Sequence, residues 1–180
     1  VCSSDLSMLK DMPVAYNLNL IVLDREGRCA LVETLDGRMA VKTIDSDSGE
    51  QALYATNHPV LAELIPYEPK AFVHSIRRYD NITAFLERHK KGITAGQLKD
   101  FFLTPYPEGL SCSYYSQFFG TTKTMVLDPV RGSLSLCWGG RPENGWRDFN
   151  FSDPFPQETA AIEIHNQTAD PSIFAYRSLV

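Results

Sequence analysis

The order of elements along this sequence predicts an α+β fold, in which helices pack on antiparallel sheets. Strand-like runs come first, two amphipathic helical stretches follow, and a second group of strand-like runs comes after the helices. Short connections between strand-like runs favour antiparallel neighbours, and segregated strands and helices are typical of this class. Because the runs of the first group are apolar, we expect both faces of their sheet to be covered.

The first group is predicted to be a four-stranded antiparallel meander. Its runs occupy residues 19–24, 29–35, 39–44 and 51–56. Asp36-Gly37, between the second and third runs, is a strong signal for a two-residue hairpin turn. The fourth predicted strand delivers the chain directly to the polar residues that follow position 56.

Two helices are predicted after the meander. In residues 75–89, apolar side chains recur at spacings of three and four, as an amphipathic helix requires. The positive charge and the glycine in residues 90–92 are both favoured at a helix C-terminus. A second helix is predicted to begin at Thr94 and to end at Thr104, because Thr94 and Gln97 have the spacing of a capping box.

A β hairpin is predicted after the helices, with strands at 122–128 and 133–138. One further short edge strand is predicted at 146–151. From residue 152 to residue 180 prolines and polar residues dominate, so residues 152–180 are expected to form an irregular C-terminal tail.

The composition and the net charge of the chain argue against some classes of binding partner. The chain has 180 residues, of which 43% are hydrophobic and 22% charged, as is ordinary for a globular domain. The net charge of −5 and the scattered basic residues argue against a nucleic-acid partner. A membrane partner is not expected either, since no apolar run approaches the ~20 residues that a membrane-spanning helix needs. A homo-oligomer of the intact protein stays open.

The cysteines and histidines show no metal-ligand pattern. Cys29, Cys112 and Cys137 match neither the spacing of a zinc site nor that of a redox pair. We interpret them as buried free thiols in a reduced compartment, which slightly favours the cytoplasm. The histidines that lie outside any ligand spacing are His74, His89 and His165. We therefore predict no metal site and no cofactor.

The first residues suggest that the chain is a piece of a longer protein. Residues 1–6 match the conceptual translation of a common sequencing-adapter tail, so they are expected to be foreign to the protein. We expect residues 7–151 to be the C-terminal part of one domain, followed by the tail at 152–180. Cys2 falls within the foreign stretch, which argues against Cys2 as a catalytic nucleophile.

The clearest candidate functional feature is an amide and an imidazole, Asn57 and His58, directly before Pro59. Strand ends and the loops after them are where a rigid scaffold presents polar groups to a ligand. Asn57 offers two N–H donors and a carbonyl acceptor and is neutral at any pH, which suits stabilisation of a negative oxygen. The alternative is that Asn57 only caps a turn. For His58, contact with a substrate and a hydrogen bond to a backbone carbonyl both stay open.

An ordered set of motifs resembles one known family. The motifs are residues 19–24, Thr56-Asn57-His58-Pro59, Ser75-Ile76-Arg77-Arg78-Tyr79, residues 120–129 and residues 138–142. Together they resemble the later half of peptidase C45, the acyl-coenzyme A:6-aminopenicillanic acid acyltransferase-like proteins, which are kin of the choloylglycine hydrolases. The resemblance covers roughly residues 8–150 and depends on the whole ordered set, because single motifs of this kind are weak.

The resemblance implies an N-terminal nucleophile hydrolase with an αββα sandwich, of which this chain holds the later half. Such an enzyme matures by self-cleavage that exposes an N-terminal cysteine. The cysteine thiolate attacks an amide carbonyl, its own α-amine serves as the base, and water or an amine then takes the acyl group from the acyl-enzyme. The implied substrate is a small molecule with a linear amide C–N bond. The nucleophile is expected upstream of residue 1, so the fragment alone should be inactive.

The resemblance also implies two catalytic residues. Asn57 matches the family's strand-end asparagine, a catalytic position. Arg78 matches an arginine that lies by the nucleophile, where its charge would lower the pKa of the thiol. Arg77 leaves this second assignment ambiguous by one position.

Roles are also predicted for three further polar residues. His58 and Thr122 are expected to contact the substrate, although an exposed strand threonine without such a role is the alternative. Glu33 is interpreted as a structural residue that pairs with a neighbouring strand or with Lys42.

Two other functions are kept as alternatives. A different N-terminal nucleophile hydrolase, such as an acid ceramidase-like enzyme, would share the fold but act on another substrate. A non-catalytic β-rich binding module would have no reactive residue. The sequence upstream of this chain separates the alternatives, since it would begin a strand with cysteine, with serine or threonine, or with no nucleophile.

Overall fold

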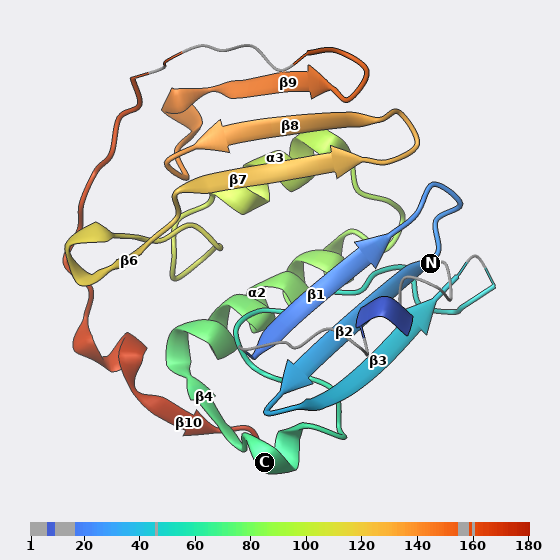
Figure 1. Cartoon of the computed structure of the whole chain (residues 1–180). Helices are drawn as coiled ribbons and strands as arrows, with labels where there is room; N and C mark the ends of the chain where they lie inside the picture. The colour runs from blue at the N-terminus through green and yellow to red at the C-terminus, as the bar shows by residue number, and fades with distance from the viewer. Residues whose placement is uncertain (1–6, 10–16, 46, 155–158, 160) are drawn as a thin grey trace. The chain divides into compact units, whose positions relative to one another are not determined.

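The computed structural model describes residues 7–9, 17–45, 47–154, 159 and 161–180. The chain divides into two compact units, Val1–Tyr79 with Phe174–Val180, and Asp80–Ile173. Both units combine helical segments with antiparallel sheets, which agrees with the α+β class predicted from the sequence (Figure 1).

The first unit is built on a three-stranded antiparallel meander. It consists of β1 (Leu18–Leu23), β2 (Cys29–Leu35) and β3 (Arg38–Ile44), with β2 in the centre (Figure 1). The predicted two-residue turn joins β2 to β3. Asp36 and Gly37 both have positive φ there, 47° and 74°, as the turn with the matching twist requires.

The central strand β2 carries the core of this sheet. Ala30, Leu31 and Val32 are 0%, 2% and 0% exposed. Because successive side chains of a strand point to opposite faces, consecutive buried residues mean that both faces of β2 are covered, as expected. The edge strand β1 differs, since Ile21 and Leu23 are 48% and 49% exposed.

Residues 51–56, predicted to be the fourth strand of the meander, do not form a strand. The prediction was wrong because side chains, and not a strand ladder, bind the backbone at the end of this segment. Asn19 Nδ2, on β1, donates to the carbonyl oxygens of Thr56 and His58, each at 2.8 Å. Asn57 therefore lies in a bend tied to β1, and not at the tip of a strand.

A short second sheet in the first unit joins segments that are far apart in the sequence. β4 (Lys70–Phe72) pairs antiparallel with β10 (Tyr176–Ser178). The rings of Phe72 and Tyr176 lie 4.3 Å apart. The prediction of an irregular tail over 152–180 was wrong for β10, because its partner strand lies far earlier in the chain and no local pattern indicates the pairing.

The two predicted helices are present. α2 (Val73–Arg88) follows β4 directly, begins in the first unit and ends in the second. α3 (Ala95–Leu103) belongs to the second unit. Phe85 of α2 is buried and stacks on Phe101 of α3 with ring centroids 4.1 Å apart, which joins the apolar sides of the two helices.

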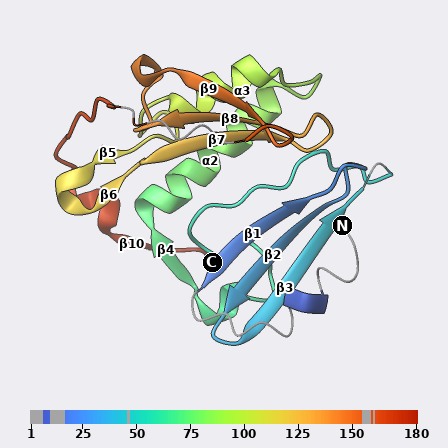
Figure 2. The same ribbon diagram turned by 45° about the horizontal axis from the view of Figure 1, so that its top comes forward.

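The second unit contains the predicted hairpin and edge strand. β7 (Lys123–Asp128), β8 (Ser133–Trp138) and β9 (Trp146–Asn150) form one antiparallel sheet in that order (Figure 2). α3 packs against β7. A pair of two-residue strands, β5 (Ser113–Tyr114) and β6 (Phe119–Gly120), was not predicted. Among the described residues, no helix has the length and apolar character needed to cross a membrane.

Short 3-10 helices complete the described elements. They are η1 (Ile65–Tyr67), η2 (Tyr115–Gln117), η3 (Pro142–Asn144) and η4 (Pro171–Phe174). η1 lies in the first unit and leads toward β4, so it sits on the path from the Asn57 bend to α2.

The capping box at the start of α3 gives a test of local stability. Thr94 Oγ1 accepts from the Gln97 backbone N–H at 3.2 Å, and Gln97 Oε1 accepts from the Thr94 backbone N–H at 2.9 Å. Thr94→Ala removes the first bond and is expected to lower the free energy of unfolding by about 1 kcal/mol, whereas Thr94→Ser keeps it. Urea denaturation followed by circular dichroism measures the difference. Equal stabilities of the two variants would contradict the expectation.

Candidate active site

The bend at residues 56–58 is held by a helix as well as by the sheet. Ser75 Oγ, in the first turn of α2, accepts from the Asn57 backbone N–H at 2.8 Å. Thr56 Oγ1 donates to the Ser75 carbonyl oxygen at 3.0 Å. Ser75 is 0% exposed. With Asn19 bound on the other side, the backbone of Asn57 is fixed between β1 and α2.

His58 belongs to the same hydrogen-bond network. Its Nδ1 lies 2.8 Å from Ser75 Oγ and 3.1 Å from Thr56 Oγ1. The imidazole is 6% exposed and meets the ring of Tyr79 edge-on, with centroids 5.6 Å apart. Both of these groups near Nδ1 are hydroxyl groups. The hydrogen bond from His58 to a backbone carbonyl, considered from the sequence, stays an alternative. Substrate contact by His58 stays a prediction.

The structure brings Asn57 and Arg78 together. Arg78 Nη2 donates to Asn57 Oδ1 at 2.6 Å. Because Oδ1 accepts from the guanidinium, the Nδ2 end of the carboxamide, with its two N–H donors, points away from Arg78. The Asn57 side chain is exposed, so these donors are accessible to a ligand. Of the two neighbouring arginines, half-buried Arg78 contacts Asn57 and Arg77 is exposed. Which of them matches the family's arginine stays a prediction.

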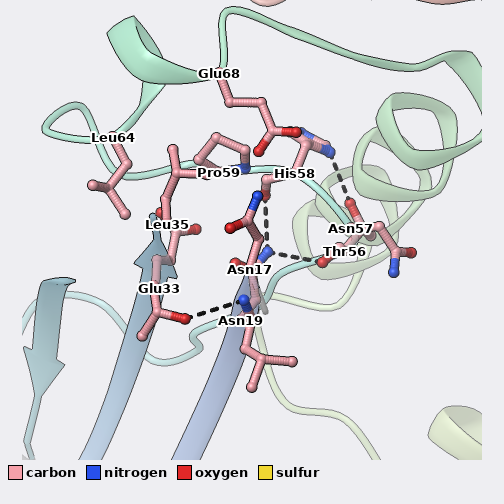
Figure 3. A pocket seen from close by; sticks show the side chains of 12 residues that line it. Asn17, Asn19, Glu33, Leu35, Thr56, Asn57, His58, Pro59, Leu64 and Glu68 are labelled. Atoms are coloured by element: carbon pink, nitrogen blue, oxygen red, sulfur yellow. Dashed lines mark hydrogen bonds between the residues drawn. The ribbon is translucent and has the colours of Figure 1, made fainter. Parts of the chain in front are cut away.

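A cavity of about 200 Å³ opens beside this bend, within the first unit. Figure 3 shows Asn57 and His58 at one side of the cavity and Glu33 and Glu68 among its other lining residues. No lysine or arginine occurs among the described lining residues. A neutral or positively charged ligand group would therefore be favoured there over a carboxylate.

Glu33 anchors the chain that follows the bend. Its Oε1 accepts from the Val60 N–H at 2.8 Å and its Oε2 from the Leu61 N–H at 2.9 Å. Glu33 is 1% exposed, and this burial raises the pKa of its carboxyl group. A structural role was expected, but the partner was wrong, because Lys42 pairs with Glu50 at 2.7 Å and Glu33 binds backbone N–H groups.

His74 also contacts the Arg78 guanidinium. Its Nδ1 lies 3.2 Å from Arg78 Nη2, and its carbonyl oxygen accepts from Arg78 Nε at 3.3 Å. Burial of the ring, followed by the nearby charge of Arg78, lowers the pKa of His74 to about 4. At neutral pH the imidazole is therefore uncharged.

Two sequence predictions fall elsewhere in the chain. Thr122 belongs to the second unit, where it is exposed and its carbonyl oxygen accepts from the Gly139 N–H at 2.8 Å. Substrate binding by Thr122 stays a prediction. Residues 1–6, predicted to be foreign to the protein, lie outside the described residues, and so does Cys2, which was weighed as a nucleophile.

Three residues of this site were missed from the sequence as functional candidates. On α2, Ser75 lies three residues and His74 four residues before Arg78. Asn19 is a polar residue inside an apolar strand. The available signal was the polar interruption of an apolar run at Asn19. No pattern pairs Ser75 with the backbone of Asn57, since the two are 18 residues apart.

The described part of the chain contains neither a metal-like cluster nor a disulfide. No group of three or more His, Cys, Asp or Glu side chains within it has the arrangement of a metal site. Cys29, Cys112 and Cys137 are buried thiols that form no disulfide within the described residues, as expected from the sequence. Burial raises the pKa of the Cys29 and Cys137 thiols, which makes both poor nucleophiles.

Comparison with models of protein families gives a match that covers most of the chain. A family model described as acyl-coenzyme A:6-aminopenicillanic acid acyl-transferase matches residues 5–143. This range contains both Asn57 and Arg78 and corresponds to the stretch whose motifs resembled that family. No curated protein and no solved structure gives a significant match.

Proposed function

Because this chain belongs to the acyl-coenzyme A:6-aminopenicillanic acid acyl-transferase family, we propose that it carries the oxyanion-binding part of a cysteine N-terminal nucleophile amidohydrolase or acyltransferase. The family makes the protein an enzyme of the acyltransferase or hydrolase kind. The finer assignment depends on one observation, the hydrogen bond from Arg78 Nη2 to Asn57 Oδ1 at 2.6 Å.

Asn57 is proposed to bind the oxygen that becomes negative during acyl transfer. When a thiolate attacks an amide carbonyl, the C=O π bond opens and its electron pair moves to the oxygen. A neutral carboxamide that points its N–H donors at this oxygen stabilises it without adding negative charge. Arg78 supports this role, because its bond to Oδ1 leaves Nδ2 as the outward end of the side chain.

The rest of the proposed cycle conserves atoms and charge. The tetrahedral intermediate expels the amine, which takes a proton from the α-ammonium group of the nucleophile, and a thioester remains on the cysteine. Water then attacks the thioester in hydrolysis, or a second amine attacks it in acyl transfer, and the α-amine takes the proton of the attacking group. The second tetrahedral intermediate then breaks its C–S bond, which releases the acyl product and returns the cysteine sulfur as the leaving group. Either attack passes through another oxyanion, so Asn57 is used twice in each turnover.

The nucleophile is proposed to be a cysteine encoded upstream of residue 1. The described cysteines are unsuited to the role, because Cys29, Cys112 and Cys137 are all buried and a nucleophile must reach its substrate. We further propose that residues 7–151 are the later part of one αββα sandwich domain, which the upstream chain completes. The substrate is proposed to be a small molecule with a linear amide bond.

Recovering the longer reading frame tests this proposal. We expect expression of that frame to yield a chain with an N-terminal cysteine after self-cleavage, detectable by N-terminal sequencing. The matured enzyme should hydrolyse or transfer acyl groups of N-acyl amides, and its Cys→Ser variant at the new N-terminus should be inactive or strongly impaired. A serine or threonine there would instead indicate another class of N-terminal nucleophile hydrolase. No nucleophile, with no turnover, would leave the binding-module alternative.

A further inference from the structure

We propose that His74 is a positioning residue, which accepts a hydrogen bond from Arg78 through Nδ1 and thereby fixes the orientation of the Asn57 carboxamide. The catalytic consequence of this inference rests on the proposed function. Its structural part, the effect of His74 on Arg78 and Asn57, does not depend on it and is measurable in this chain.

The contacts of the guanidinium define the arrangement. Arg78 Nη2 lies 2.6 Å from Asn57 Oδ1 and 3.2 Å from His74 Nδ1, while Arg78 Nε donates to the His74 carbonyl oxygen at 3.3 Å. A guanidinium only donates hydrogen bonds. His74 Nδ1 must therefore be the acceptor, which requires a neutral imidazole with its proton on Nε2.

The surroundings of His74 hold the ring in this state. The side chain is 5% exposed, stacks on Phe72 at 5.3 Å between centroids, and meets Phe174 edge-on at 5.9 Å. The backbone N–H of Val73 donates to the Ala175 carbonyl oxygen at 2.9 Å. The C-terminal segment thus contributes to the support of His74, and burial among aromatic rings disfavours the protonated form.

The orientation of the Arg78 guanidinium determines the orientation of the Asn57 carboxamide. With its Nε and Nη2 atoms both bound to His74, the planar guanidinium has little freedom to rotate, so Nη2 stays directed at Oδ1. The Asn57 side chain itself is exposed, and without this partner its two ends would exchange places freely. His74 therefore acts through Arg78 and does not itself contact the proposed oxyanion.

The structural part is tested by nuclear magnetic resonance on the 180-residue chain. In the unaltered chain at about pH 7, we expect His74 to show a protonated Nε2 and a bare Nδ1, since the acceptor form is required. A proton on Nδ1, or a charged ring, would overturn the proposal. This measurement needs no variant, so misfolding of a variant does not affect it.

Three variants extend the test. His74→Phe keeps an aromatic ring between Phe72 and Phe174 but removes the acceptor, and His74→Asn restores an acceptor oxygen near the position of Nδ1. We expect hydrogen exchange at Arg78 Nε to accelerate about tenfold or more in His74→Phe, with shifted Asn57 side-chain amide signals, and to recover at least partly in His74→Asn. His89→Phe, at the residue that follows the C-terminal end of α2, is the matched control and should leave both signals unchanged. Unchanged signals in folded His74→Phe would overturn the proposal.

The catalytic part uses the matured enzyme. There His74→Phe is expected to lower kcat about tenfold or more with little change in KM, because the misdirected amide affects the transition state more than the bound substrate. His74→Asn should recover part of the loss. Altered Arg78 and Asn57 signals with an unchanged kcat would refute the catalytic role and keep the positioning contact. Absence of both amide hydrolysis and acyl transfer in the unaltered enzyme would refute the proposed function instead.

Discussion

Asn57→Ala is expected to lower kcat of the matured enzyme by about 10²–10³-fold, the usual effect of removing one oxyanion donor. The reason is that Asn57 presents its Nδ2 donors outward, while Arg78 occupies Oδ1 at 2.6 Å. Because the donated hydrogen bonds strengthen only as negative charge develops, KM should change little. Steady-state kinetics on an N-acyl amide that the enzyme accepts gives both constants.

Two further variants make this prediction specific. Asn57→Asp has nearly the same shape but places a negative charge beside the developing oxyanion, so its kcat should fall at least as far as that of Asn57→Ala. Asn150→Ala, on β9 of the second unit, removes an exposed asparagine side chain that accepts from Ser152, and it should leave kcat within about twofold. A kcat of Asn57→Ala close to that of the unaltered enzyme would contradict the oxyanion role.

Glu33→Ala is expected to lower the free energy of unfolding of the chain by about 3 kcal/mol. Glu33 is 1% exposed and accepts from the backbone N–H groups of Val60 and Leu61, both of which lose their partner. Urea denaturation measures the loss. Glu26→Ala is the matched control, because that carboxylate is exposed and pairs with exposed Arg28. This substitution should cost less than about 1 kcal/mol. Equal effects of the two variants would contradict the anchoring role.

The pH dependence of Glu33 has a defined sign. Burial raises its folded-state pKa above the usual 4.5, so between these two values the folded chain binds more protons than the unfolded chain. The part of the stability that depends on the titration of Glu33 is therefore fully present below 4.5 and is lost as pH rises through the folded pKa, whereas the anchoring hydrogen bonds to Val60 and Leu61 are a separate contribution. Glu33→Gln, which does not titrate, should flatten this part of the pH–stability curve. An unchanged curve in Glu33→Gln would contradict the assignment of the raised pKa.

Elements specified by local chemistry were predictable from the sequence. Asp36-Gly37 can form the tight turn because both residues tolerate positive φ, and the Thr94 capping box defines the start of α3 through bonds within one helical turn. The periodic apolar positions of α2 and the hairpin of β7 and β8 have similarly local causes. Each of these signals lies within a few neighbouring residues.

Elements that depend on distant partners were not predictable in this way. Residues 51–56 have the composition of a strand, but Asn19 and Ser75 bind the adjoining backbone and no ladder forms. β10 is a strand only because β4 lies beside it. In both cases a residue far away in the sequence decides whether the segment forms a strand, and the periodicity of the local sequence does not indicate such a partner.

The residues of the candidate site also differ in how far they could be predicted from the sequence. Asn57 and Arg78 were proposed from motifs in family order, and the structure places them 2.6 Å apart. Their supports, Ser75, His74 and Glu33, act through hydrogen bonds that span up to 28 residues or fix a side chain one turn away. Residue type alone does not distinguish these supporting residues from surface residues, because serine, histidine and glutamate also occur at solvent-exposed positions.

The most direct test of the central claim is to identify the atom that carries the acyl group during turnover. The matured enzyme would be mixed with a slowly released N-acyl amide, quenched, and mapped by peptide mass spectrometry. The account predicts one acyl group as a thioester on the N-terminal cysteine, accumulating much more slowly in Asn57→Ala. An acyl group on Cys29, Cys112 or Cys137, or turnover with no acyl-enzyme and no dependence on Asn57, would contradict it.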